Sequence, residues 1–329
     1  MTLDYERVAT ALAANPDYRV LRRLKPLPPS TTAKAGAATI KVVVLDTEST
    51  GLNPEEDKII DVGLLVLEVD ASTGEFVRIS QTFECLEDPG APISGHITAL
   101  TGITDMMVTG KKIDDKAFES YFRDVALVIA HSANHDRPFL EMRFPFLQHL
   151  PWACSLREID WVAEGRGSSK LEFLAYSIGL FYEGHRALVD CHALSNVLVG
   201  AKLHTGETPL QALIAASFTS EHRIFATGAP FEKKDDLRNQ GYRWDAEGRV
   251  WHLLVQDNRN LERELQWLHA EIYDTRPARI RLERRDARVK FSHREGEDFM
   301  MSLGAQGDQT GIENRRSRAG MQGGMLRRP

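Results

Sequence analysis

The sequence predicts an α/β domain with a mixed β-sheet, followed by a small α+β module. Apolar runs of strand length come first and segments of helical spacing follow, and a second apolar pattern begins after residue 222. A chain of 329 residues can hold one domain of roughly 180 residues and a smaller unit, because single cores seldom exceed about 250 residues. We therefore expect two folded units.

Residues 1–38 are expected to form an N-terminal extension and a linker. They contain a short amphipathic stretch and then KPLPPSTTAKAGAAT, a composition typical of linkers. The continuous apolar run at 40–45 predicts a buried central strand. Two further strands are predicted at 58–68 and 75–84, and the turn-prone sequence DASTG between them indicates a hairpin or meander.

Helical spacing replaces the strand pattern from residue 95 onward. A strand at 126–130 and three helices are predicted here, with the helices near 134–143, 170–180 and 189–203. We place the first domain at 39–204. Residues 205–222 are expected to be a linker or helical connection.

The small module is predicted at 223–290. Its elements are a helix at 233–239, strands at 242–244 and 250–255, and a helix at 261–273. Residues 291–329 are expected to be a basic, disordered tail, because the end of the chain is rich in Gly, Gln and Arg. Residues 275–329 carry 13 Lys and Arg against 7 Asp and Glu, although the whole chain has a net charge of −6.

Composition excludes several classes of protein. No run of about 18 apolar residues could cross a bilayer, and the N-terminus lacks the pattern of a secretion signal, so a cytoplasmic protein is expected. The three cysteines, Cys85, Cys154 and Cys191, suit neither a disulfide framework nor a zinc site. We expect them to be buried free thiols.

The most informative motif is Asp46-Thr47-Glu48-Ser49-Thr50-Gly51-Leu52, at the end of the predicted central strand. Because side chains alternate along a strand, Asp46 and Glu48 should share one face, about 6.5 to 7 Å apart. Carboxylates held this close repel each other unless cations lie between them, and oxygen ligands suit Mg²⁺ or Mn²⁺. The alternative for the pair alone is that both acids are simply solvated.

Two further acids favour the metal site. Asp136 follows the strand at 126–130 and begins a helix, and Asp190 begins another. Strand ends and helix starts gather at one edge of an α/β sheet, where four acids could hold two metals about 3.5 to 4 Å apart. His185 follows Gly184 in a loop and could accept a proton from the attacking water, since the unperturbed pKa of histidine is about 6.5.

Three motifs in order, DTESTGL at 46–52, AHSANHDRPFL at 130–140 and HRALVD at 185–190, resemble the DnaQ-like DEDDh 3′-5′ exonucleases. That family is typified by the proofreading subunit of the bacterial replicative polymerase. The similarity covers about residues 40–203. ISGHITALTGIT at 93–104 is also similar to the stretch that lines the opening of the family's active site. The resemblance implies an RNase H-like mixed five-stranded sheet flanked by helices.

The resemblance also implies roles for individual residues. Its metal ligands are Asp46, Glu48, Asp136 and Asp190, and its general base is His185. Substrate contacts fall on Thr47, Gly51, Leu52 and Ser132. For Leu52, ordinary packing is an equally open alternative. Ser132 and His135 replace the family's usual Asn and Phe, which affects substrate contacts and packing more than chemistry. His131, His135 and His192 are expected to be packed or hydrogen-bonded, with no catalytic role.

The segment APFEKKDDLRNQGYRWDAEGRVWHL resembles a small α+β module that accompanies several nucleic-acid-processing enzymes. Arg243 and Arg249 interleave with Tyr242, Trp244 and Trp251, a mixture that can contact phosphate and stack on bases. The alternative is that the aromatic residues form the core of the module.

The sequence thus predicts an enzyme that uses Mg²⁺ or Mn²⁺ to hydrolyse terminal phosphodiesters 3′ to 5′, releasing nucleoside 5′-monophosphates in proofreading, repair or processing. DNA is the favoured substrate. The expected partners are single-stranded or 3′-ended nucleic acid and a DNA polymerase complex. Two alternatives stay open: an RNA-trimming exonuclease or oligoribonuclease, and a catalytically silent module that binds nucleic acid or a polymerase.

Overall fold

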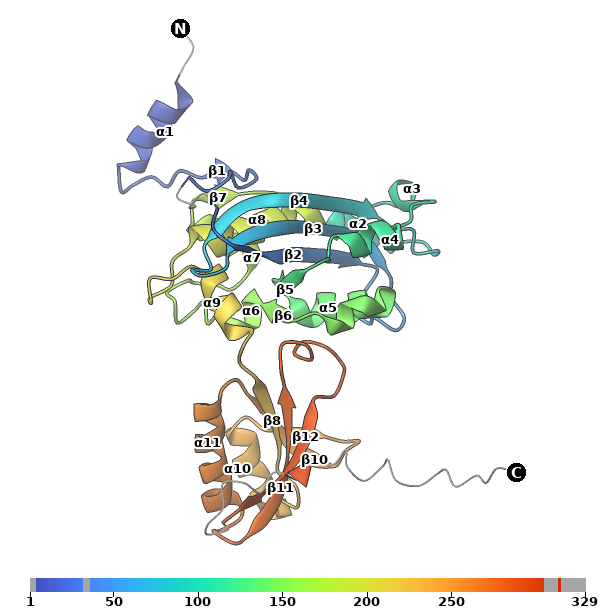
Figure 1. The fold of residues 1–329 in the computed structure, drawn as a ribbon, viewed down its shortest axis with the longest axis vertical. Coiled ribbons are helices and arrows are strands. Elements are labelled where there is room, and N and C mark those ends of the chain that lie inside the picture. The colour runs from blue at the N-terminus through green and yellow to red at the C-terminus, as the bar shows by residue number, and fades with distance from the viewer. Residues whose placement is uncertain (1–3, 32–35, 305–312, 315–329) are drawn as a thin grey trace, which may run out of the picture. The chain divides into compact units, whose positions relative to one another are not determined.

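The computed structural model describes residues 4–31, 36–304 and 313–314. The chain divides into two compact units, and each has its own sheet (Figure 1). Unit 1 is residues 1–218 with 291–293, and unit 2 is residues 219–290 with 294–329. None of the helices in the described ranges combines the length and apolarity that a membrane crossing requires.

Unit 1 contains the predicted mixed five-stranded sheet, in the order β4-β3-β2-β5-β6. Its strands are β2 (Thr39–Ser49), β3 (Ile59–Asp70), β4 (Phe76–Leu86), β5 (Val125–Ala130) and β6 (Trp152–Cys154). The first three form the expected antiparallel meander, whereas β5 and β6 run parallel to β2. The central strand β2 therefore pairs on both sides, which explains its continuous apolar sequence.

Helices cover both faces of this sheet. They are α2 (Gly95–Thr101), α3 (Asp105–Val108), α4 (Asp115–Ser120), α5 (Ala133–Arg143), η1 (Pro145–His149), α6 (Ser155–Glu158), α7 (Leu171–Ser177), α8 (Ala187–Gly200) and α9 (Pro209–Ala216). Val42 and Val44 of β2 pack with α7, α8 and α9 in one apolar cluster. Val43 and Leu45 pack with α4 and α5 in another, as the alternation of strand side chains requires.

The N-terminal extension is partly structured. It contains α1 (Tyr5–Ala13), which has no buried residue, and the short strand β1 (Arg22–Arg23). β1 pairs in parallel with β7 (Leu180–Phe181), and Leu24 and Leu27 pack on the adjoining core cluster. The residues before the first domain therefore contribute to unit 1, which the linker-like composition did not indicate.

Unit 2 is a small antiparallel sheet with helices, in the strand order β13-β12-β11-β8-β10-β9. Its elements are β8 (Glu221–Phe225), η2 (Phe231–Lys233), α10 (Lys234–Asn239), β9 (Arg243–Asp245), β10 (Val250–Val255), α11 (Asn258–Trp267), η3 (Leu268–Ile272), β11 (Ala278–Arg285), β12 (Glu297–Leu303) and β13 (Glu313–Asn314). The predicted small α+β module is therefore present.

The prediction that the tail begins at residue 291 is wrong for residues 297–303. These form β12, which pairs antiparallel with β11 from Ala278↔Leu303 to Arg284↔Glu297. The reason lies in an alternation that the polar composition of the chain end obscured: Phe299, Met301 and Leu303 all pack on the core of unit 2. The rest of the predicted disordered tail, 305–312 and 315–329, lies outside the described residues.

Candidate active site

The acids of the first motif lie at the end of β2, on the face that α8 covers. In the ladder with β3, Asp46 lies opposite Gly63 and Glu48 opposite Asp61. Carboxylate oxygens of Asp46, Glu48 and Asp190 all lie within 4.8 Å of one another. Asp190, which is 142 positions beyond Glu48 in the chain, is thus brought to the end of β2, and three oxygen ligands converge there. This is the donor chemistry that Mg²⁺ and Mn²⁺ prefer.

Gly63 allows Asp190 to reach this group. A side chain at Gly63 would overlap the backbone of Ala187 and Leu188, in the first turn of α8. Because residues directly opposite each other in an antiparallel pair share a face, the missing side chain leaves space beside Asp46. The first turn of α8, with Asp190, occupies that space.

The fourth acid, Asp136, lies in the first turn of α5 and is held by Thr47. Its Oδ1 accepts hydrogen bonds from the Thr47 backbone N–H at 3.0 Å and from the Thr47 hydroxyl at 2.8 Å. Its Oδ2 is buried and has no hydrogen-bond partner among the described residues. A buried carboxylate oxygen without a donor is costly unless a cation satisfies it. The hydroxyl of Thr47, a predicted substrate contact, donates to Asp136 and is buried.

Burial and mutual repulsion dominate the electrostatics of the four acids. Burial first, and then the charges of Asp190 and Asp61, raise the pKa of Glu48 to about 8. Burial also raises the pKa of Asp136 to about 7, against the opposing effect of the Thr47 hydrogen bonds. The pKa of Asp46 lies well above its ordinary value, first through burial and then through Asp136 and Asp190. A divalent cation would relieve both burial and repulsion, so the donor set fits such an ion.

The metal-free protein is expected to lose stability as the pH rises from about 4 to 8. In the folded protein Glu48 and Asp136 keep their protons up to pH values of about 8 and 7, whereas the unfolded chain ionises them near 4. The unfolded state binds fewer protons in this window, so rising pH favours unfolding. Thermal unfolding in EDTA should give a Tm that falls across the window, and Mn²⁺ should restore it at pH 8.

Glu48→Gln isolates this effect from other titrating groups. The variant keeps the shape of the side chain but cannot ionise, so its Tm advantage over the wild type in EDTA should grow with pH. A constant difference between the two proteins from pH 5 to 8 would contradict the proposed cost of ionising Glu48.

His185 lies in the loop that precedes α8. Its backbone has a φ of +65°, and its side chain is 45% exposed. Nε2 lies 4.0 Å from Oε1 of Glu172. Burial raises the pKa of Asp190, and hydrogen bonds from Tyr182 and nearby backbone, together with the charge of His185, oppose the rise. The imidazole is thus beside the acidic group and accessible to water.

The loop after β2 presents Leu52 to solvent. Leu52 is 86% exposed and belongs to no apolar cluster of the described residues, which excludes ordinary packing as its role. A side chain at Gly51 would overlap the carboxylate of Asp57, which accepts hydrogen bonds from the Asn53 backbone and the Thr50 hydroxyl. The close approach at Gly51 therefore shapes the loop that carries Leu52.

The other motif histidines have structural partners. His131 is largely buried, with ring nitrogens 2.7 Å from Ser155 Oγ and 3.0 Å from the Ser169 carbonyl, and burial lowers its pKa to about 4. His135 lies 3.3 Å from Ser49 Oγ and its ring contacts Phe139. His135 thus fills a packing position between β2 and α5. Ser132 precedes α5, and its carbonyl accepts the N–H groups of His135 and Asp136.

Comparison with known proteins agrees with this site. The sequence model of the Exonuclease family matches residues 43–198, which span the site from Asp46 to Asp190. This match supports the resemblance of residues 43–198 to the DnaQ-like exonucleases. Curated relatives include the DNA polymerase III PolC-type proteins of Thermotoga petrophila, 29% identical over 165 residues, and of Caldanaerobacter subterraneus subsp. tengcongensis, 34% identical over 167 residues. Each alignment covers 48% of this chain and 11% of the relative, so the chain spans about a tenth of these relatives.

Solved structures similar to the exonuclease domain include Exonuclease X in complex with 5′ overhanging duplex DNA. It has a TM-score of 0.36 and 22% identity, over 52% of this chain and 99% of that one. The nuclease domain of 3′hExo, a DEDDh family member bound to rAMP, has a TM-score of 0.38 and 18% identity, over 51% of this chain and 92% of that one.

The exonuclease domain also holds supporting residues that the sequence did not point to. The hydroxyl of Tyr182 donates to Asp190 Oδ1 at 3.0 Å, and the backbone N–H of Arg186 donates to Asp190 Oδ2 at 3.1 Å. The guanidinium of Arg186 pairs with the buried carboxylate of Asp61 at 2.9 Å, which ties the His185 loop to β3. Arg186 lies inside the third motif, but neither motif nor spacing identifies its partner.

The two remaining predicted residues, Arg243 and Arg249, belong to unit 2. Both are exposed, on β9 and in the turn before β10. Of the neighbouring aromatic residues, one belongs to the core of the module and another is exposed, as base stacking would require. Tyr242 is core, whereas Trp244 is 50% exposed and its ring lies 5.5 Å from that of Trp251. Part of the arginine and tryptophan face is therefore open to solvent.

Proposed function

We propose that this protein is a metal-dependent 3′-5′ exonuclease that hydrolyses terminal phosphodiesters to nucleoside 5′-monophosphates. The observation that carries the proposal is the convergence of Asp46, Glu48 and Asp190, with Asp136 beside them presenting a buried oxygen that lacks a donor. The pKa values raised in this group make a cation-free site unfavourable. Asp46, Glu48, Asp136 and Asp190 would hold two ions of Mg²⁺ or Mn²⁺.

Such ions supply charge stabilisation for an in-line displacement at phosphorus. The protein's own residues orient and complete the site. Thr47 fixes Asp136, and Tyr182 with the Arg186 backbone fixes Asp190. His185, half exposed on a loop tied down by the Arg186–Asp61 ion pair, accepts the proton of the attacking water. Leu52 contacts the terminal base, with Gly51 shaping its loop and Ser132 lying beside the bound strand.

DNA is the substrate we favour, because the matched relatives carry the names of DNA polymerases. A DNA polymerase complex is a proposed partner on the same ground. A catalytically silent module has no need of three converging acids, a fourth beside them and an accessible histidine. The deciding experiment is digestion of end-labelled single-stranded DNA and RNA of equal sequence with Mg²⁺ and with Mn²⁺. Release of mononucleotides from the 3′ end supports the proposal, and intact substrates under all four conditions overturn it.

We also propose that unit 2 supplies affinity for nucleic acid through Arg243 and Arg249. Cations that contact phosphate release counterions, and each contact on a single strand contributes about 0.7 to the log-log slope of affinity against salt. Arg243→Ala with Arg249→Ala is expected to lower that slope by about 1.4 in fluorescence anisotropy with a single-stranded oligonucleotide. The matched control, Arg259→Ala with Arg263→Ala at two exposed positions of α11, should leave the slope unchanged. If the two double variants have equal salt slopes, Arg243 and Arg249 make no contact with phosphate.

A further inference from the structure

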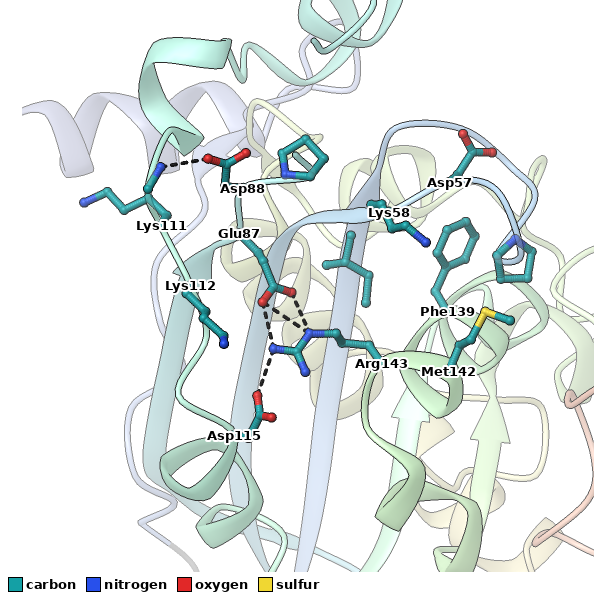
Figure 2. Close-up of a pocket in the computed structure, with 14 residues that line it drawn as sticks. Asp57, Lys58, Glu87, Asp88, Lys111, Lys112, Asp115, Phe139, Met142 and Arg143 are labelled. Carbon is teal, nitrogen blue, oxygen red and sulfur yellow. Dashed lines mark hydrogen bonds and ion pairs between the residues drawn. The ribbon is translucent and has the colours of Figure 1, made fainter. Parts of the chain in front are cut away.

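Unit 1 has a hollow whose lining includes none of the four acids of the candidate active site. It is a cleft of about 610 Å³ lined by residues of four segments. These are the loop between β2 and β3, the stretch at 87–89 after β4, the stretch at 110–115 leading into α4, and the second half of α5. Figure 2 shows Lys58, Lys111 and Lys112 around it, with Arg143 between them. We call it the lysine cleft.

The acidic residues of the lysine cleft are already engaged. The guanidinium of Arg143 binds Glu87 at 2.8 and 2.9 Å and Asp115 at 2.8 Å (Figure 2). The carboxylate of Asp88 accepts hydrogen bonds from the backbone N–H groups of Gly90 and Gly110. Asp57 likewise accepts from the 50–58 loop. These acids serve the fold. The hydrogen bond from Arg143 lowers the pKa of Asp115, and the charge of the nearby Lys112 adds a smaller effect.

The three lysines make no direct contact of this kind. Lys58, Lys111 and Lys112 are exposed, and among the described residues their ammonium groups form neither a hydrogen bond nor an ion pair. They come from two separate loops yet surround one cleft. Its lining carries as many acids as cations, but the acids are held by Arg143 and backbone N–H groups, which leaves the three ammonium groups beside an apolar wall that includes Pro54 and Met142. Lysine binds phosphate as a point charge, and an apolar wall suits a sugar or base.

The position of the lysine cleft indicates which anion it takes. Phe139 and Met142 line it, one and two turns of α5 beyond Asp136. Lys58 lies at the end of the loop that begins after Glu48. Its carbonyl accepts a hydrogen bond from the Thr50 backbone N–H, and its own N–H donates to the Thr50 hydroxyl. The loop after β2 and helix α5 therefore contribute residues both to the candidate active site and to the lysine cleft. We propose that the lysine cleft binds backbone phosphates of the nucleic acid at nucleotides away from the scissile bond, an inference that rests on the proposed function.

The test measures binding in EDTA, so that no hydrolysis occurs. The probes are 5′-fluorescein oligodeoxynucleotides of 2, 6 and 12 nucleotides, titrated with the full chain at several salt concentrations. Lys58→Ala, Lys111→Ala and Lys112→Ala together are expected to weaken binding of the 12-mer about tenfold or more, and to lower its salt slope by about 2, from roughly 0.7 per contact. The loss of affinity should increase with the length of the probe.

The matched control removes three positive charges elsewhere in unit 1, with Lys25→Ala, Arg123→Ala and Lys202→Ala, all exposed and none in the cleft. This control should retain the wild-type slope, and replacing the three cleft lysines by arginine should restore it. Equal slopes for the cleft variant and its control would overturn the proposal, as would a cleft that binds polyglutamate but no oligonucleotide. Failure of the proposed function would be seen separately, as a wild-type protein that releases no nucleotide with Mg²⁺ or Mn²⁺.

Discussion

Asp46→Asn is expected to abolish nucleotide release, with a loss of at least about 1,000-fold in kcat. Asp46 lies at the centre of the acids: it is adjacent along β2 to Glu48, opposite Gly63, and electrostatically coupled to Asp136 and Asp190. The amide keeps the shape of the side chain but removes the charge that would hold both metals, and metal-based charge stabilisation is worth several kcal/mol. Release of mononucleotides from end-labelled DNA, followed over time with Mg²⁺, measures the effect.

The same substitution should stabilise the metal-free protein at pH 8, because it removes a buried charge that burial and neighbouring acids disfavour. Opposite changes in activity and Tm distinguish loss of a ligand from misfolding. Glu119→Gln, an exposed acid on α4, is the matched control and should alter neither quantity. Wild-type rates from highly purified Asp46→Asn protein would exclude Asp46 as an essential ligand.

The strands of the meander were predictable because each is an uninterrupted run long enough to show its pattern. β3 and β4 begin and end within two residues of the predicted positions, at 59–70 and 76–86. β6 has only three residues and β1 only two, too short for any periodicity to register. β12 alternates correctly but is followed by a polar chain end whose composition dominated the prediction.

Some residues of the candidate active site were likewise predictable from the local sequence, and others were not. Asp46 and Glu48 could be placed on one face because the side-chain period of a strand depends on local sequence alone. Gly63, Tyr182 and the Arg186–Asp61 pair could not, since their roles depend on the register of β2 with β3 and on how closely α8 approaches. Thr47 shows the limit most clearly. Its place in the motif predicts a substrate contact, but only the fold reveals that its hydrogen bonds also hold Asp136.

His185→Ala is expected to lower kcat by about 100-fold or more while leaving the affinity for Mn²⁺ nearly unchanged. General-base catalysis contributes about 10² to 10⁴, and the imidazole is placed for proton transfer beside the acids without being one of the three converging donors. Single-turnover hydrolysis measures the rate, and calorimetry with Mn²⁺ in the absence of DNA measures the affinity for metal.

Added imidazole separates a proton-accepting role from a structural one. The side chain of His185 is 45% exposed, so its removal leaves an opening that a free imidazole molecule can enter from solvent. We expect imidazole to restore part of the rate of His185→Ala and to leave the wild type unaffected. His149→Ala, an exposed histidine on η1, controls for loss of a histidine elsewhere. Loss of Mn²⁺ binding in His185→Ala would make His185 a ligand. Retained binding without rescue would instead indicate that the ring positions Asp190 through the loop that Arg186 ties to Asp61.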